Sequence, residues 1–357
     1  MAETSVPSDR PTAGSLAELT TLRLGGPARR LVTATTEAEL VDTVAECDRT
    51  GEPVLVLGGG SNVVIADEGF DGTVVLVRTG GIRADPASCG WTGAEVEVAA
   101  GELWDDFVDL AIDRQWSGIE SLTGIPGLVG ATPIQNVGAY GAEVSQVITR
   151  VRTWDRQQRR QHTFAAADCG FGYRWSRFKA DPQRWLVLAV TFQFTTGELS
   201  APVGYAELAR TLGVEVGERV PAHRVRDAVR TLRAGKGMLL DPADHDTWSA
   251  GSFFTNPVLS DEVAATLPPD APRWPVGDRV KTSAAWLIDR AGFGKGYGGA
   301  VGDATVTLST KHTLALTNRG GATTADLVAL AREVRAGVSE RFGIYLVNEP
   351  VMINCTL

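Results

Sequence analysis

Residues 118–141 read GIESLTGIPGLVGATPIQNVGAYG, and this stretch decides the fold that the sequence predicts. Its six glycines and two prolines exclude one regular helix or strand. A long loop inside a compact domain is usually either functional or disordered. Disorder is disfavoured here because apolar residues recur as anchors: Ile119, Leu122, Ile125, Leu128, Val129, Ile134 and Val137. We interpret the segment as an ordered loop around a large planar or phosphorylated ligand, and a glycine-rich connector without a ligand is the alternative.

A second glycine cluster lies nearer the N-terminus, where the apolar run 54–57 leads into GGGSN at 58–62. A short all-apolar run is typical of a buried strand. Consecutive glycines after such a strand can present backbone N–H groups to a diphosphate, and Ser61 and Asn62 add side-chain donors. Neither the lysine of a Walker loop nor the third glycine of a dinucleotide fingerprint follows. The alternative is a tight turn between paired strands, because the apolar run 63–65 comes next.

The composition limits the possible partners. The chain has 357 residues, of which 43% are hydrophobic and 22% charged, as in an ordinary globular protein. Its net charge of −9 disfavours binding to nucleic acid or to an anionic membrane surface. The four cysteines and four histidines lack metal-ligand spacing, so no metal is predicted. The N-terminus lacks the pattern of a secretory signal and no apolar stretch reaches membrane-span length, so we expect a cytoplasmic protein.

Periodicity along the chain predicts two α/β units followed by a third, mixed unit. A helix is expected between the capping box that begins at Thr36 and the stop at Gly51. Further strands are expected at 93–100, 147–154 and 185–194, and further helices at 102–113, 221–236 and a last one ending at Gly343. The basic helix ends at Lys236, between two glycines, where a side chain can reach a ligand. A solvated helix face is the alternative for its arginines.

Three short segments place reactive side chains in contexts typical of loops. FGYRWSRFK carries Arg174, whose planar guanidinium can bind a carboxylate or phosphate through two hydrogen bonds. AGSFFTNP holds Ser252 between a glycine and two aromatics, without the elbow motif of a hydrolase nucleophile. LVNEP puts Glu349 in an apolar tail, where a carboxylate needs a partner. A surface ion pair, a capping serine and a salt-bridged tail explain each segment singly. Together with the two glycine loops, they indicate one functional site.

The order of these segments resembles that of the UDP-N-acetylenolpyruvoylglucosamine reductase family, the flavoenzymes of peptidoglycan precursor synthesis. The shared landmarks are TLRLGG at 21–26, LGGGSN at 57–62, IPG…PIQNVGAYG at 125–141, FGYR at 171–174, AGSFFTNP at 250–257 and FGI…EP at 342–350. They span about residues 18–353. Any one landmark is weak, but the ordered set is highly specific.

The resemblance implies an α+β fold. It consists of an FAD-binding part of the PCMH, or vanillyl-alcohol-oxidase, type with two α/β subdomains, followed by a C-terminal α+β substrate-binding domain. The expected boundaries are a flexible tail at 1–17, FAD-binding subdomains at 18–80 and 81–220, the substrate-binding domain at 221–345 and a C-terminal segment carrying the catalytic glutamate at 346–357.

The resemblance also implies non-covalent FAD, NADPH as co-substrate, and reduction of UDP-N-acetylglucosamine enolpyruvate to UDP-N-acetylmuramate by a monomer. No histidine or cysteine sits in the two glycine loops, as fits a non-covalent flavin. FAD would contact Gly58, Gly59, Gly60, Ser61, Asn62, Gly127, Ala131, Thr132, Gln135, Asn136, Gly138, Ala139 and Tyr140. The implied catalytic residues are Arg174, Ser252 and Glu349. The implied substrate contacts are Tyr205, Lys236 and Asn256.

In the implied mechanism, hydride passes from the flavin N5 to the enolpyruvyl methylene carbon and Ser252 protonates the neighbouring carbon. Arg174 and Glu349 bind the substrate carboxylate, on which negative charge develops. PVGYAEL at 202–208 resembles the tyrosine loop of the type I members. One departure is Val347-Asn348-Glu349, where many relatives have Glu-Pro-Glu. Glu349 is therefore the sole candidate for the C-terminal catalytic carboxylate.

Two other functions compete with this interpretation. The first is a flavoprotein of the same fold that oxidises a hydroxy acid or a sugar, with oxygen or a quinone as acceptor. The ordered GYR, GSFF and terminal glutamate motifs argue against it. The second is a nucleotide-sugar-binding or regulatory protein without catalysis, and the intact Arg174, Ser252 and Glu349 argue against that.

Overall fold

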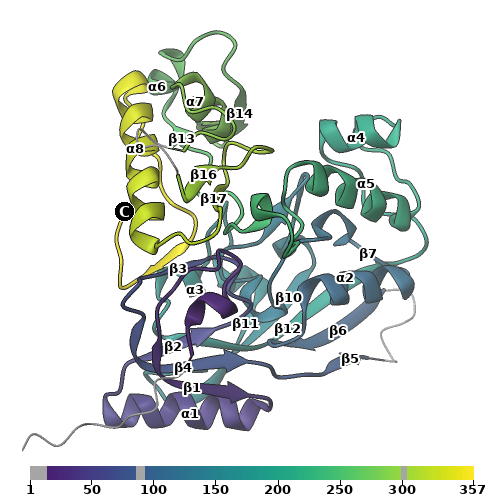
Figure 1. Cartoon of the computed structure of the whole chain (residues 1–357). Coiled ribbons are helices and arrows are strands. Elements are labelled where there is room, and N and C mark those ends of the chain that lie inside the picture. Colours follow the sequence, from purple (N-terminus) through teal and green to yellow (C-terminus); the bar gives the residue numbers. More distant parts are fainter. Residues whose placement is uncertain (1–13, 86–92, 299–303) are drawn as a thin grey trace, which may run out of the picture.

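The structure is a computed structural model that describes residues 14–85, 93–298 and 304–357. The N-terminal part of the chain forms a parallel sheet (Figure 1). Its strands pair in the order β1–β4–β2, with bounds Ala28–Ala34 for β1, Val54–Leu57 for β2 and Phe70–Val77 for β4. Helix α1 (Glu37–Thr50) covers one face. The predicted capping box at Thr36 and the stop at Gly51, whose φ is 71°, are both confirmed.

The predicted flexible tail at 1–17 falls partly outside the described residues, which start at 14. Ser15 already caps the short helix η1 (Leu16–Leu19), and Leu16 is fully buried beneath the first sheet. Residues 15–17 of the predicted flexible tail are therefore part of the fold.

A second, antiparallel sheet lies beside the first. Its order is β11–β10–β12–β6–β5, and β7 pairs with the end of β12. The bounds are β5 Ile82–Ala84, β6 Ala94–Ala99, β7 Trp116–Ser117, β10 Ile148–Asp155, β11 Arg160–Ala165 and β12 Trp185–Thr196. Helix α2 (Trp104–Asp113) packs Phe107 against Phe192, with ring centroids 5.2 Å apart. The strands and helix predicted for this region are confirmed.

The glycine-rich segment 118–141 follows β7 as an ordered, layered loop. It contains the short elements η3 Glu120–Leu122, η4 Val129–Ala131 and β8 Gly138–Ala139. Just beyond it, β9 (Ala142–Glu143) pairs with β8, and η5 (Val144–Gln146) follows. Its predicted apolar anchors lie in or against the core of the second sheet. Burial of these anchors explains how a segment with so many glycines holds one conformation.

Helices α4 (Ala206–Leu212) and α5 (Ala222–Gly235) pack on each other, and ion pairs join α5 to α2. Arg230 of α5 lies 2.9 Å from Asp105 and 3.0 Å from Asp109, both on α2. The helix with which the predicted substrate-binding domain begins therefore sits on the second FAD-binding unit. Short helices η6 (Ala166–Cys169) and α3 (Arg177–Ala180) complete that unit.

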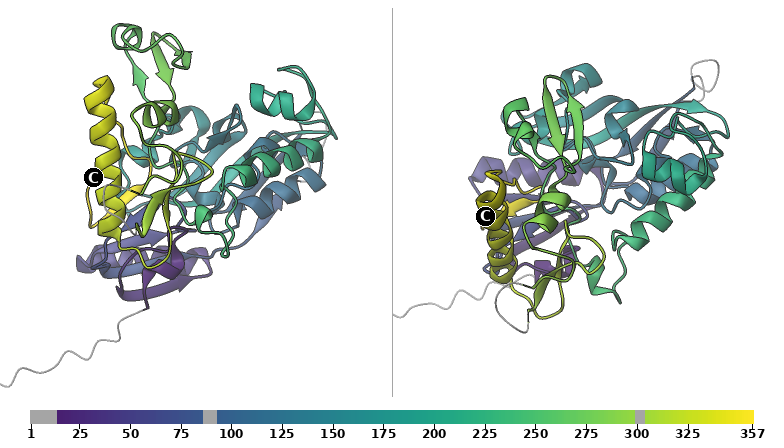
Figure 2. Two further views of the ribbon diagram at one scale, coloured as in Figure 1. Left: turned by 45° about the horizontal axis from the view of Figure 1, so that its top comes forward. Right: turned by 90° about the horizontal axis from the view of Figure 1, so that it is seen from above.

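The C-terminal part forms a separate apolar core under its longest helix, α8 (Thr324–Phe342). Its small sheet has the order β13–β15–β14 and lies at the opposite end of the molecule from α1 (Figure 2). The remaining bounds are η7 His245–Thr247, β13 Val258–Leu259, α6 Asp261–Ala265, β14 Arg273–Val276, β15 Arg279–Thr282, α7 Ala284–Arg290, β16 Val306–Leu308 and β17 Leu316–Asn318.

The last strand, β18 (Val351–Ile353), returns to the N-terminal part and pairs in parallel with β3 (Val63–Ile65). This pairing excludes a tight turn between two paired strands at 58–62, since β2 pairs with β4 and β3 pairs with β18. Asp67, just after β3, accepts hydrogen bonds from two backbone N–H groups at the start of α8. The segment that follows the glycine turn at 58–62 is thus joined to the C-terminal part through both β18 and α8. Within the described ranges, every helix is too short or too polar to cross a bilayer.

Candidate functional site

Two of the three predicted catalytic side chains, Arg174 and Glu349, form an ion pair. Nε of Arg174 lies 2.9 Å from Oε1 of Glu349, and Nη2 donates to the carbonyl oxygen of Gly138 at 2.9 Å. The Nε–H is buried and has no aligned acceptor in the described part of the chain, so the contact with Glu349 is a charge pair. Arg174 has a φ of 53°, which is uncommon outside glycine and here directs the side chain back over the loop.

The surroundings of Glu349 act on its pKa in opposite directions. Burial raises the pKa of this carboxyl group, and the positive charges of Arg174 and Lys179 oppose that rise only in part. Lys179 itself donates from Nζ to the carbonyl oxygen of Arg174 at 3.1 Å. Burial lowers the pKa of Lys179. A carboxyl group held in this way can act as a hydrogen-bond donor, as well as a charge partner of Arg174.

Two cations that the sequence analysis gave no role also face this site. Lys179 belongs to the FGYRWSRFK segment, and its position five residues after Arg174 is the signal that was available. Lys281 of β15 lies with Nζ 4.8 Å from the ring centroid of Tyr173, and Arg174 lies 5.4 Å from the same centroid. No local pattern marks Lys281, because a fold contact alone brings β15 to the GYR segment.

Ser252 is joined to the Arg174–Glu349 pair through the backbone. The N–H of Glu349 donates to the carbonyl oxygen of Phe253 at 2.8 Å, and Phe254 forms a β-bridge with Asn348. Phe253 and Phe254 are buried, whereas Ser252 is partly exposed. The Ser252 hydroxyl makes no hydrogen bond to any residue that the structure describes, so it is free to serve a ligand.

The predicted FAD-binding turn packs directly against the glycine-rich loop. A Cβ on Gly59 would lie 2.8 Å from Cα of Gly127, so neither position has room for a side chain. Ser61 Oγ donates to the carbonyl oxygen of Pro126 at 2.9 Å and fastens the turn to the loop. Among the described residues, the N–H groups of Gly59, Gly60 and Ser61 donate to no protein acceptor. Free amides in a glycine turn fit an anionic diphosphate, so these residues are compatible with FAD.

The other predicted FAD contacts lie in the same loop, but several of their polar groups already form hydrogen bonds within the protein. The N–H groups of Ala131 and Thr132 bond within η4, and Gly138 and Ala139 form β8. Asn136 is buried, and its side chain bonds to Glu143, to the carbonyl of Gly172 and to the N–H of Ser145. These residues shape the loop, whatever further contacts they make with a cofactor.

Gln135 and Asn62, which were also predicted to contact FAD, form hydrogen bonds toward Glu349. Nδ2 of Asn62 donates to Oε1 of Gln135 at 3.1 Å. Nε2 of Gln135 in turn donates to Oε1 of Glu349 at 3.3 Å. Nδ2 of Asn62 also lies 3.5 Å from the backbone carbonyl oxygen of Glu349. The turn, the loop and the C-terminal carboxylate therefore share one hydrogen-bond network.

The predicted substrate contacts Tyr205 and Lys236 lie together around Tyr140. The rings of Tyr140 and Tyr205 meet edge to face with centroids 5.8 Å apart, and Tyr205 is exposed. Nζ of Lys236 lies 5.5 Å from the Tyr140 ring centroid and 2.6 Å from Oε2 of Glu207. A Cβ on Gly141 would lie 2.8 Å from the backbone of Gly204, so the glycine-rich loop and the tyrosine loop touch.

Asn256 lies on the other side, between the GYR segment and helix α7. Its Oδ1 accepts a hydrogen bond from the N–H of Ala284 at 2.9 Å. Its own N–H donates to the hydroxyl of Tyr173 at 3.3 Å. The predicted site residues thus form two groups, one around Arg174 and one around Lys236, with the glycine-rich loop contacting both.

His312 is a partly buried histidine beside Lys236. Burial, reinforced by the positive charges of Lys236 and Lys295, lowers its pKa to about 4. The folded protein therefore resists protonation that the unfolded chain accepts at its ordinary pKa of 6.5. Stability is expected to fall as the pH drops from 6.5 toward 4, by about 2–3 kcal/mol if this histidine acts alone.

Urea unfolding of wild type and His312→Asn across this pH range tests that expectation. The variant should lose less stability on acidification, while His223→Asn, which alters an exposed histidine of α5, should follow the wild type. Parallel curves for wild type and His312→Asn would show that His312 titrates normally in the fold.

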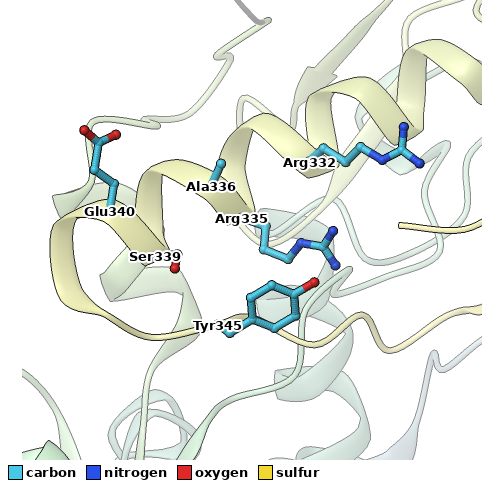
Figure 3. A pocket seen from close by; sticks show the side chains of 6 residues that line it. All are labelled: Arg332, Arg335, Ala336, Ser339, Glu340 and Tyr345. Atoms are coloured by element: carbon cyan, nitrogen blue, oxygen red, sulfur yellow. The ribbon is translucent and has the colours of Figure 1, made fainter.

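A surface hollow of about 670 Å³ lies elsewhere, on the outer side of α8 (Figure 3). It is lined by Arg332, Arg335, Ala336, Ser339, Glu340 and Tyr345. The guanidinium of Arg335 lies 4.5 Å from the ring centroid of the exposed Tyr345. No residue of the predicted site lines this hollow, so it is separate from the network around Arg174.

Comparison with known proteins gives consistent matches over nearly the whole chain. The family "FAD binding domain" matches residues 28–163, and "UDP-N-acetylenolpyruvoylglucosamine reductase, C-terminal domain" matches residues 241–353. The UDP-N-acetylenolpyruvoylglucosamine reductase of Cutibacterium acnes is 62% identical over 96% of this chain and 90% of its own length. That of Streptomyces coelicolor is 58% identical over the same shares.

The same similarity extends to a solved structure. The crystal structure of UDP-N-acetylenolpyruvylglucosamine reductase from Thermus caldophilus aligns with a TM-score of 0.62 at 26% identity, covering 95% of this chain and 97% of that one. The predicted α+β fold, with an FAD-binding part and a C-terminal domain, is confirmed.

Proposed function

This chain belongs to the UDP-N-acetylenolpyruvoylglucosamine reductase family, and from that premise we propose that it reduces UDP-N-acetylglucosamine enolpyruvate to UDP-N-acetylmuramate, with FAD as cofactor and NADPH as electron donor. The observation that carries the proposal is the Arg174–Glu349 pair, to which Ser252 is joined by the Glu349–Phe253 backbone hydrogen bond. The pair presents an unaligned guanidinium N–H and a carboxyl group whose pKa is raised by burial. Those are the donors that a substrate carboxylate requires.

The cofactor is assigned to the turn at 58–62 and the facing loop around Gly127. The free N–H groups of Gly59, Gly60 and Ser61 would hold the diphosphate of FAD. When bound, the flavin supplies the hydride that reaches the substrate, and NADPH supplies the electrons. The close approach of Gly59 to Gly127 keeps the two walls of this site together without a side chain between them.

Arg174 and Glu349 act on the carboxylate of the enolpyruvyl group. Addition of hydride to the methylene carbon moves the electron pair of the C=C bond toward that carboxylate. Arg174 stabilises the developing charge through its cation, and Glu349 in its protonated form donates a hydrogen bond instead of repelling it. A raised pKa for Glu349 is therefore a functional requirement of this arrangement.

Ser252 completes the reaction by transferring its hydroxyl proton to the carbon next to the carboxylate. The C=C bond has then gained one hydride and one proton, and the product is a lactyl ether. The hydroxyl is suited to this role because it makes no hydrogen bond within the described protein residues. The serine regains its proton from solvent, to which it is partly exposed.

Anaerobic spectroscopy tests the proposal. The purified protein, loaded with FAD, should show a flavin spectrum that NADPH bleaches and that UDP-N-acetylglucosamine enolpyruvate restores. A bleached spectrum that only oxygen or a quinone restores would identify an oxidase or dehydrogenase of the same fold instead. Absence of flavin binding after reconstitution would contradict the assignment of both glycine segments.

Glu207 is expected to compete with the substrate for Lys236. Its carboxylate lies 2.6 Å from Nζ of Lys236, the lysine that is predicted to contact the UDP-sugar substrate. Both side chains are about one third exposed, so the pair contributes little stability and is easily exchanged. Glu207→Gln should therefore bind UDP about twofold to fivefold more tightly, as titration calorimetry would measure.

A matched control for this variant is Glu215→Gln, which removes one negative charge from an exposed position in the same unit. Its UDP affinity should stay near that of the wild type. Weaker binding by Glu207→Gln would show instead that Glu207 positions Lys236 for the ligand.

A further inference from the structure

The hydrogen-bond network around Gln135 permits only one orientation of its side-chain amide. Asn62 reaches the carbonyl oxygen of Glu349 with Nδ2, at 3.5 Å, so its NH2 group faces that oxygen and Oε1 of Gln135. If the Gln135 amide were flipped, the two NH2 groups would face each other. The observed orientation therefore directs Nε2 of Gln135 at Oε1 of Glu349.

The two oxygens of Glu349 differ as a consequence. Oε1 accepts a hydrogen bond from Nε2 of Gln135 at 3.3 Å and lies 2.9 Å from the positively charged guanidinium of Arg174 at Nε, so a donor and a positive charge both face it. A proton on Oε1 would reduce the negative charge of the oxygen that faces the Gln135 donor and the Arg174 cation. Oε2 has no such partner among the described residues and is the oxygen on which the proton is accommodated without a clash.

From this asymmetry we propose that Gln135 is a positioning residue for the reaction: its amide, oriented by Asn62, holds Oε1 of Glu349 and leaves Oε2 to present the proton to the substrate carboxylate. The inference rests on the proposed function, since it assigns Gln135 an action through Glu349. It also gives Asn62 a second role. Asn62 ends the flavin-binding turn and precedes β3, which pairs with β18, so the turn and Glu349 are held in one register.

A double-mutant cycle in FAD-saturated protein tests the inference. Gln135→Ala is expected to slow reoxidation of the reduced enzyme by UDP-N-acetylglucosamine enolpyruvate about tenfold to a hundredfold, the scale of a misplaced catalytic group. In a Glu349→Gln background, the group that Gln135 positions is already lost. The same change should therefore alter the logarithm of the reoxidation rate by less than about a third of its effect in the wild type. Equal effects in both backgrounds would overturn the proposal.

The pH dependence of the variant Gln135→Glu distinguishes a positioning role from a merely structural one. Its carboxylate is similar in size and still accepts from Asn62, but it can donate to Glu349 only when protonated. Reoxidation by this variant should therefore recover toward the wild-type rate as the pH falls. A pH profile parallel to that of the wild type would contradict the positioning role, whether or not the alanine variant folds.

Two further measurements separate the possible failures. The dissociation constant of FAD, measured by flavin fluorescence, should change less than about threefold in Gln135→Ala, whereas a loss of FAD affinity with unchanged reoxidation would mark Gln135 as a flavin contact only. Gln146→Ala in η5, where the Gln146 side chain accepts a hydrogen bond from the N–H of Glu143, is the control and should react normally. Failure of the wild type to be reoxidised by the substrate would overturn the proposed function itself.

Discussion

Ser252→Ala is expected to be reduced by NADPH at the wild-type rate but reoxidised by UDP-N-acetylglucosamine enolpyruvate about 10²–10⁴-fold more slowly. A positioned proton donor contributes on that scale. NADPH reduction needs no proton transfer from the serine, so only the second half-reaction should respond. The hydroxyl has no structural hydrogen bond to lose within the described residues, and the variant should therefore unfold at nearly the wild-type temperature.

Anaerobic stopped-flow absorbance separates the two half-reactions for this variant. Ser260→Ala is the matched control: Ser260 caps α6 on the surface, and its replacement should leave both rates unchanged. Ser252→Cys retains an acidic hydrogen and should recover part of the loss. An equal slowing of reduction and reoxidation in Ser252→Ala would exclude the proton-donor role.

Arg174→Ala is expected to slow reoxidation by about 10²–10³-fold, the effect of removing one preorganised donor from a developing charge. The loss has two sources. The substrate carboxylate loses its cation, and the buried carboxyl group of Glu349 loses the charge that partly offsets its desolvation. Arg174→Lys should recover only part of the rate, because an ammonium cannot face Glu349 and the carbonyl of Gly138 together as the guanidinium does.

Pairing this change with Glu349→Gln separates stability from chemistry. The double variant Arg174→Ala/Glu349→Gln no longer buries an unpaired carboxyl group, so its thermal unfolding midpoint should exceed that of Arg174→Ala. Its reoxidation rate should stay low. Reduction by NADPH should remain near the wild-type rate in all of these variants, and a comparable loss there would indicate a damaged flavin site instead.

Local sequence predicted much of the secondary structure, and it also supplied the candidate site residues. Helix α1 follows from a capping box at Thr36 and a left-handed glycine at 51, both of which act within a few residues. The glycine segments at 58–62 and 118–141 are visible because backbone freedom depends on residue type alone. Arg174, Ser252 and Glu349 could be proposed because each stands in a short motif whose neighbours limit the conformations open to it.

Contacts between distant segments were decided only by the tertiary structure. The sequence indicated that Glu349 needs a partner, but Arg174 lies 175 residues earlier, and only the folded chain places its Nε 2.9 Å from Oε1 of Glu349. Parallel pairing of β18 with β3 places Asn62 beside Glu349, and the glycine-rich loop places Gln135 there. No periodicity in the sequence predicts either contact. The packing of α5 on α2 likewise depends on Arg230 meeting two aspartates more than 100 residues away.

The physical reason for this division is the range over which each interaction acts. Turn chemistry, capping and hydrophobic periodicity depend on residues within one or two turns of the chain, so they can be read in order from the sequence. Strand pairing and ion pairs depend on which surfaces meet after the cores have formed, and apolar burial selects those surfaces without regard to sequence distance. The sequence by itself thus determined the local elements and the candidate reactive groups of this protein, whereas the fold decided which of those groups lie next to one another.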